Sequence, residues 1–189
     1  MEAFSDGVIA VIITIMVLEL EAPEGADWAA LQPQMPVFLS YVLSFVFVGI
    51  YWANHHHMFQ AVERIHGGVL WANLHLLFWI SLTPFVTAWM GQSHFAPWPV
   101  ASYGVVLLMC AIAYTILAQM LVRHHGQDST FARALGSDTK GKVSLALYVA
   151  GVALAFRQPS LACALYALVA LLWLVPDRRF ERALEGRKA

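Results

Sequence analysis

Charged side chains are scarce in this chain. Asp, Glu, Lys and Arg make up 12% of its 189 residues, whereas soluble domains contain about 25%. Hydrophobic residues make up 60%, above the usual share of about 45–50%. This balance excludes an ordinary soluble domain. It predicts an all-α membrane protein, because long apolar segments cross a bilayer as helices whose backbone groups are satisfied internally.

Net charge and cysteine are scarce as well. The formal net charge is −1, so the chain has no basic surface of the kind that binds nucleic acid. The two cysteines, Cys110 and Cys163, both lie in apolar segments. They exclude a disulfide scaffold and are interpreted as packing residues. No basic stretch precedes the first apolar segment, so we expect no cleavable signal sequence.

Six apolar segments are interpreted as membrane spans of a single domain over residues 1–189. They lie at residues 4–20, 37–61, 69–90, 100–122, 143–156 and 161–175. Pro84 should kink the third segment near its far end. The last two segments are short, so they either rely on flanking basic residues that reach the headgroups or form a re-entrant pair.

The basic residues predict the orientation of these spans. With six spans, every one of the eleven Lys and Arg residues except Arg157 lies on the same side. Short loops rich in Lys and Arg stay in the cytoplasm. Both termini are therefore expected to be cytoplasmic.

The first span has an acid near each end, Asp6 and Glu19, and Thr14 is the one polar side chain between them. At 100° per residue, its larger apolar residues share one stripe. The stripe consists of Phe4, Val8, Val11, Ile15 and Leu18. Such a stripe either packs against other helices or lines a passage.

Acidic residues gather where the first span is expected to leave the membrane. Glu19 and Glu21 are followed by Glu24 and Asp27, and no basic residue lies among them. Acids at one opening would concentrate cations and repel anions. The alternatives are that Glu19 is simply solvated or anchors a neighbouring helix.

Polar side chains are expected at one level near the cytoplasmic ends of the first three spans. They are Ser5, Asp6, His55, His56, Asn73 and His75. Polar groups inside a membrane are costly and suggest a role. Three interpretations remain: a structural network that locks the first span, a gate sensitive to pH or ions, and a metal site. No metal is expected, because His55, His56 and His57 point in different directions around a helix.

Three motifs together resemble one known family. Phe4-Ser5-Asp6 opens the first span, Trp52-x-x-His55-His56-x-x-Phe59 lies on the second, and Asn73 and Pro84-Phe85 lie on the third. They resemble the potassium channel family called transmembrane protein 175, most specifically in the first three spans. The family's signature places an Arg four residues before its Phe, a position that would precede Met1.

The resemblance implies a bacterial plasma-membrane protein that forms a homotetramer with the first span around a central pore. It implies a constriction at Val11, Ile15 and Leu18, with the Thr14 hydroxyl beside it. The family has no carbonyl-lined filter, so a narrow side-chain passage selects ions. The resemblance also implies no cofactor. Its implied partners are other copies of the chain, the bilayer, and potassium with other monovalent cations.

Two other classes of function are weighed against a channel. A secondary transporter would show broken helices near the midplane and a paired repeat, and Pro84 is the one hint of that. An intramembrane enzyme would need a nucleophile or a metal-binding pair such as His-Glu-x-x-His. The chain contains no such pair, so we expect no enzyme.

Overall fold

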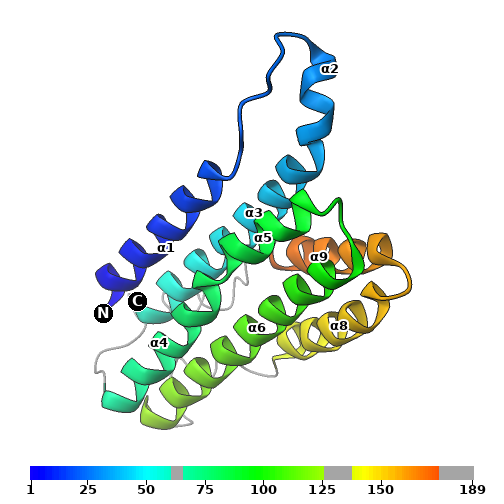
Figure 1. The fold of residues 1–189 in the computed structure, drawn as a ribbon. Helices are drawn as coiled ribbons and strands as arrows, with labels where there is room; N and C mark the ends of the chain where they lie inside the picture. Colours follow the sequence, from blue (N-terminus) through cyan, green and yellow to red (C-terminus); the bar gives the residue numbers. More distant parts are fainter. Residues whose placement is uncertain (61–65, 126–137, 175–189) are drawn as a thin grey trace.

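The computed structural model describes residues 1–60, 66–125 and 138–174, and these residues form helices and connecting loops with no strand among them (Figure 1). The all-helical class expected from the sequence is confirmed. The helices are α1 (Glu2–Leu18), α2 (Trp28–Leu31), the 3-10 turn η1 (Gln32–Gln34), α3 (Met35–Gln60), α4 (Gly67–Ser81), α5 (Thr83–Gln92), α6 (Pro97–His125), α8 (Thr139–Ala155) and α9 (Pro159–Leu174).

Three helical stretches are long and apolar enough to cross a membrane. They are Trp28–Gln60, Gly67–Gln92 and Pro97–Arg123, and Pro159–Leu174 is a shorter apolar helix. Helices occupy all six places where the sequence predicts spans. The last residues of the second and sixth predicted spans, 61 and 175, lie outside the described residues.

The third predicted span is broken into two helices. Helix α4 ends at Ser81, α5 begins at Thr83, and Pro84 occupies the first turn of α5. Proline has no N–H to donate to the carbonyl four residues earlier, and its ring clashes with that carbonyl. The break therefore occurs where Pro84 predicts a kink.

The helices at all six predicted spans begin two to four residues earlier than the hydrophobic pattern predicts, and the local reason is clear for α8 and α9. Helix α8 starts at Thr139 because the Asp138 carboxylate caps it, accepting a hydrogen bond from the Gly141 N–H at 2.9 Å. Helix α9 starts at Pro159, since proline suits the first turn of a helix. Hydropathy alone places both starts too late because the capping turns are polar.

Helix α1 lies at one flank of the bundle, with α8 and α9 toward the other (Figure 1). It packs against α3, α4 and α5, while α6 packs against α4, α5, α8 and α9. The buried face of α1 consists of Ser5, Ile9, Ile12 and Met16. Because these residues recur at helical spacing, the opposite face of α1 points away from its own subunit.

Helices α3 and α5 approach each other closely at Gly91. A Cβ atom added there would lie 2.7 Å from the Val37 Cα atom and also against the Ser40 hydroxyl. Real Cβ atoms are not found so near a backbone atom. Small residues allow membrane helices to pack at this distance.

Gly91→Ala should therefore force α3 and α5 apart and destabilise the fold. Overpacking of this kind typically costs about 1–3 kcal/mol. Thermal unfolding in detergent measures the change. Gly49→Ala is the matched control, since nothing lies within 4 Å of a Cβ atom at Gly49. Equal melting temperatures for the two variants would contradict the close approach.

Candidate functional site

The stripe predicted on α1 lies on the surface of the subunit. Val11 is 55%, Ile15 43% and Leu18 79% exposed. Phe4 is exposed as well, while Val8 is half-buried. Packing inside one subunit therefore does not explain the stripe. Another surface, either lipid or a further copy of the chain, must cover it.

The Thr14 hydroxyl is exposed and lies on the same side of α1. It donates a hydrogen bond to the Val11 carbonyl at 2.8 Å. This bond uses the hydroxyl proton and leaves an oxygen lone pair directed outward. The Thr14 oxygen can therefore accept a hydrogen bond from water or contact a cation while its hydroxyl stays bonded to the Val11 carbonyl.

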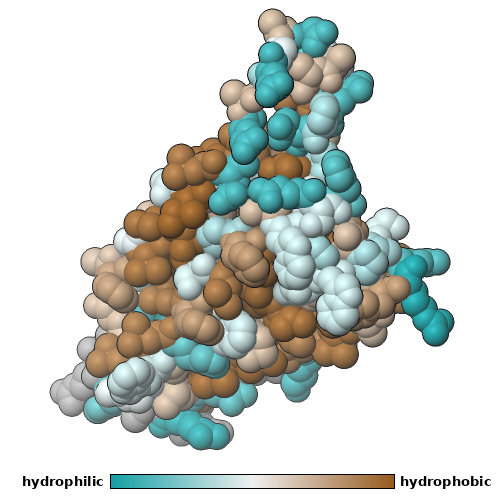
Figure 2. All heavy atoms as spheres, in the orientation of Figure 1, coloured by the Kyte–Doolittle hydropathy of each residue, from teal (hydrophilic) through white to brown (hydrophobic). Residues whose placement is uncertain are grey.

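An apolar groove of about 1150 Å³ runs between α1 and α5. On the α5 side Phe85 and Trp89 are stacked, with ring centroids 6.0 Å apart. The α1 side includes Val11 and Ile15, and Glu19 lies at one end. Figure 2 shows a largely hydrophobic surface along this flank. In a membrane protein such an apolar face is covered either by lipid or by another protein surface.

Three of the expected polar residues form a buried chain of hydrogen bonds. Asn73 on α4 donates its side-chain N–H to the Ser5 hydroxyl oxygen at 2.9 Å, and its amide oxygen lies 2.7 Å from His55 Nε2. The Ser5 hydroxyl in turn donates to the Met1 carbonyl at 3.2 Å. All three side chains are buried. The chain therefore joins α1, α3 and α4.

The donor directions along this chain are consistent. Because the Asn73 N–H points to Ser5, its oxygen faces His55 and accepts from the Nε2–H of that ring. The imidazole then carries its proton on Nε2, and its Nδ1 atom is buried without a hydrogen-bond partner among the described residues. Contact with the Phe59 ring, tilted by 39° at 4.5 Å between ring centroids, holds the imidazole in place.

Asp6 and His56 lie beside this chain and not in it. Asp6 accepts a hydrogen bond from Trp52 Nε1 at 3.0 Å, and His56 Nδ1 lies 2.9 Å from a carboxylate oxygen of Glu2. The single network expected from the sequence is thus corrected to a buried chain and a more exposed cluster. Glu2 and Trp52 were not predicted to belong to the more exposed cluster. Trp52 was a signal in the sequence, because it begins the motif on the second span that resembles the family.

The remaining predicted residues do not join either group. His75 accepts a hydrogen bond from Trp79 Nε1 at 2.9 Å within α4. Glu19 follows directly on α1, and both Glu19 and Glu21 are exposed. The two acids are therefore accessible to solvent near the end of α1.

A second buried polar cluster was not anticipated from the sequence. The Ser44 hydroxyl lies 2.7 Å from that of Thr87 and 3.0 Å from that of Tyr103. These residues join α3, α5 and α6. The spacing of Ser40 and Ser44, one helical turn apart, was the available signal, since small polar residues mark helix contacts in membranes.

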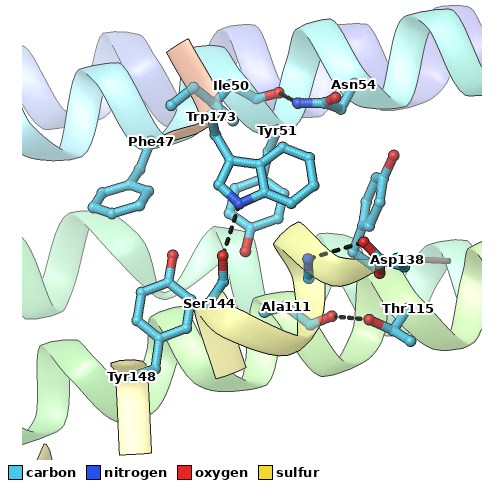
Figure 3. Close-up of a pocket in the computed structure, with 12 residues that line it drawn as sticks. Phe47, Ile50, Tyr51, Asn54, Ala111, Thr115, Asp138, Ser144, Tyr148 and Trp173 are labelled. Atoms are coloured by element: carbon cyan, nitrogen blue, oxygen red, sulfur yellow. Dashed lines mark hydrogen bonds between the residues drawn. The ribbon is translucent and has the colours of Figure 1, made fainter. Parts of the chain in front are cut away.

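A small cavity lies between α3, α6, α8 and α9, away from α1 (Figure 3). Its volume is about 40 Å³, enough for roughly three water molecules. Tyr51, Tyr148 and Trp173 supply most of its aromatic wall, and Trp173 Nε1 donates to the Ser144 hydroxyl at 2.9 Å (Figure 3). Because α1 contributes no wall, the cavity is separate from the exposed stripe.

Comparison with known proteins identifies the family. Residues 1–84 match the family model described as the endosomal/lysosomal potassium channel TMEM175. A protein of Chryseobacterium sp. (strain P1-3) named as a potassium channel is 56% identical over 185 residues, covering 98% of this chain and 96% of the relative. Another so named, from Streptomyces collinus, is 33% identical, covering 91% and 89%.

A solved structure agrees with this match. It is the crystal structure of a lysosomal potassium-selective channel TMEM175 homolog from Chamaesiphon minutus, with a TM-score of 0.81 and 27% identity. The similarity covers 93% of this chain and 95% of that one. The resemblance read from the first three spans is therefore confirmed, and the chain belongs to the TMEM175 family.

Proposed function

We propose that this protein is a potassium-permeable cation channel, a homotetramer in which α1 of each subunit lines a central pore. One observation carries the proposal: the exposed apolar stripe of α1, in a chain whose relatives are named as potassium channels. Val11, Ile15 and Leu18 form successive rings of the constriction. Branched apolar rings resist hydrated ions by excluding water.

A closed assembly follows from the shape of the subunit. One pore-lining helix at the flank of a bundle cannot enclose a passage, whereas four copies around an axis can. The groove between α1 and α5 then receives the α1 helix of the neighbouring subunit. This contact would bury the apolar wall formed with Phe85 and Trp89. Val11 and Ile15 form the α1 wall of this groove, so in this arrangement they border both the neighbouring helix and the axis.

In this proposal the side chains of α1, and not backbone carbonyls, determine which ions pass. The sequence has no Thr-Val-Gly-Tyr-Gly string to supply a ring of backbone carbonyls. Thr14 supplies hydroxyl oxygens between the apolar rings, and Glu19 and Glu21 raise the cation concentration at the external mouth. The positive-inside distribution supports cytoplasmic termini, and the bacterial relatives support a bacterial plasma membrane.

Electrical recording from purified protein in planar bilayers tests the function. We expect ohmic current carried by potassium that falls when sodium replaces potassium. A saturating flux coupled to a second ion would instead indicate a secondary transporter. Absence of any current from protein that is folded and tetrameric would overturn the proposal.

The assembly is tested by its mass. Native mass spectrometry in detergent should give four times the subunit mass of 21.0 kDa. Cross-linking of single cysteines placed on α1 should yield species up to the tetramer. If only monomers or dimers are found, the proposed pore is excluded.

A further inference from the structure

The cluster beside the buried chain brings three potential metal ligands together. Glu2 and Asp6 lie one turn apart at the start of α1, and His56 lies in the last turns of α3. Their ligand atoms all lie within 4.8 Å of one another. Carboxylate and imidazole groups at this separation need only small rotations to bind one ion at the usual distances of about 2.0–2.2 Å.

The His56 ring turns its Nδ1 atom toward this cluster. Its Nδ1 atom is shielded from solvent and has no hydrogen bond of acceptable geometry among the described residues. The nearest charged atom is a Glu2 carboxylate oxygen, at 2.9 Å. A neutral imidazole with Nδ1 deprotonated is the form that binds a metal ion.

The surroundings of the ligands also suit a metal ion. Trp52 Nε1 donates to Asp6, and its ring stacks on His56 at 5.8 Å between centroids. The Gln60 side-chain amide lies 2.8 Å from His56 Nε2. The amide atom that faces the ring is Gln60 Nε2, and rotation of the amide by 180° would let its oxygen accept the Nε2–H when Nδ1 binds a metal ion. Both supports are typical of ligands in metal centres.

We propose that Glu2, Asp6 and His56 form a binding site for a divalent transition-metal ion such as Zn²⁺. An imidazole with two carboxylates favours such an ion over Mg²⁺ or Ca²⁺, which take oxygen ligands. Water completes the coordination. Of the three adjacent histidines only His56 takes part, and the other ligands come from α1.

A bound ion would cross-link the first turn of α1 to the end of α3. The site adds a contact between these helices outside the buried chain of Ser5, His55 and Asn73. The proposal does not rest on the channel function, because metal binding is measured without any current. If α1 lines the pore, the same ion also restrains the pore helix.

Isothermal titration of the detergent-purified full chain with Zn²⁺ tests the site. We expect one ion per subunit and a higher melting temperature with Zn²⁺ present. Mg²⁺ and Ca²⁺ should not compete at equal concentration. The proposal would be overturned if the titration gave no saturable binding of one Zn²⁺ ion per subunit. It would also be overturned if Mg²⁺ displaced the bound Zn²⁺.

Variants separate this site from other histidines. His56→Ala and Glu2→Gln should each weaken Zn²⁺ binding at least tenfold, and Trp52→Phe should weaken it about 10- to 100-fold by removing the support of Asp6. His57→Ala is the matched control, because its ring lies next to His56 but outside the ligand set. Equal loss in the His57 and His56 variants, or unchanged binding in Glu2→Gln, would refute the site.

Discussion

Replacing Ile15 with Asn is expected to increase the current several-fold and to weaken the preference for potassium over sodium. The side chain is 43% exposed on the outer face of α1 and lies midway along the stripe. Four amides introduced at one level would bring water and oxygen ligands into a dry constriction. Bilayer recording under symmetrical potassium, followed by sodium replacement, measures both changes.

Val17→Asn provides the matched control for this experiment. Val17 is 44% exposed on the same helix, but at 100° per residue it lies well off the stripe. Its replacement should leave ion preference unchanged. If Asn at Val11, Ile15 and Leu18 leaves the current as in the unaltered protein, the ions pass elsewhere and the assignment of the pore helix fails.

Much of the geometry of α1 could be predicted from its sequence. The 100° periodicity distinguishes the stripe of Val11, Ile15 and Leu18 from the face of Ile9, Ile12 and Met16. Periodicity does not say which apolar face is buried, since both are hydrophobic. In the structure the buried face of α1 is the one that contains the small polar Ser5, whose hydroxyl accepts a hydrogen bond from Asn73.

The polar contacts were predictable only in part, for a physical reason. Residue type indicates that Ser5, His55 and Asn73 need partners in a low-dielectric region. Their pairing depends on the rotation of α3 and α4 about their axes, which no local pattern encodes. The same rotation places His55 inward and His56 outward, so that Asp6 meets Trp52 instead of His55. The Ser44 and Thr87 contact depends in addition on the close approach at Gly91.

Asn73→Leu should be the most destabilising single change in the subunit. Leucine is similar in size but strands the His55 Nε2–H and the Ser5 hydroxyl oxygen, both buried. A buried polar group without its partner costs about 1–3 kcal/mol, so both losses together exceed the effect of Gly91→Ala. Thermal unfolding in detergent and the yield of assembled protein measure this loss.

Asn54→Leu is the control for a lost amide, because among the described residues the Asn54 side chain bonds only to the Ile50 carbonyl of its own helix. Its effect should be clearly smaller. Asp6→Ala should also be milder, since Asp6 is only half-buried and outside the chain.

A double-mutant cycle distinguishes the buried chain from ordinary packing. Once Asn73 is leucine, His55 already has no partner, so His55→Leu should add little cost or recover stability. Replacing both members of a buried pair with apolar groups is often nearly neutral, and contacting residues are non-additive for this reason. Strictly additive losses at Asn73 and His55 would mean that the bond seen between them contributes nothing. The attachment of α1 would then rest on the packing of Ile9, Ile12 and Met16 and on the polar contacts of α1 that do not involve His55.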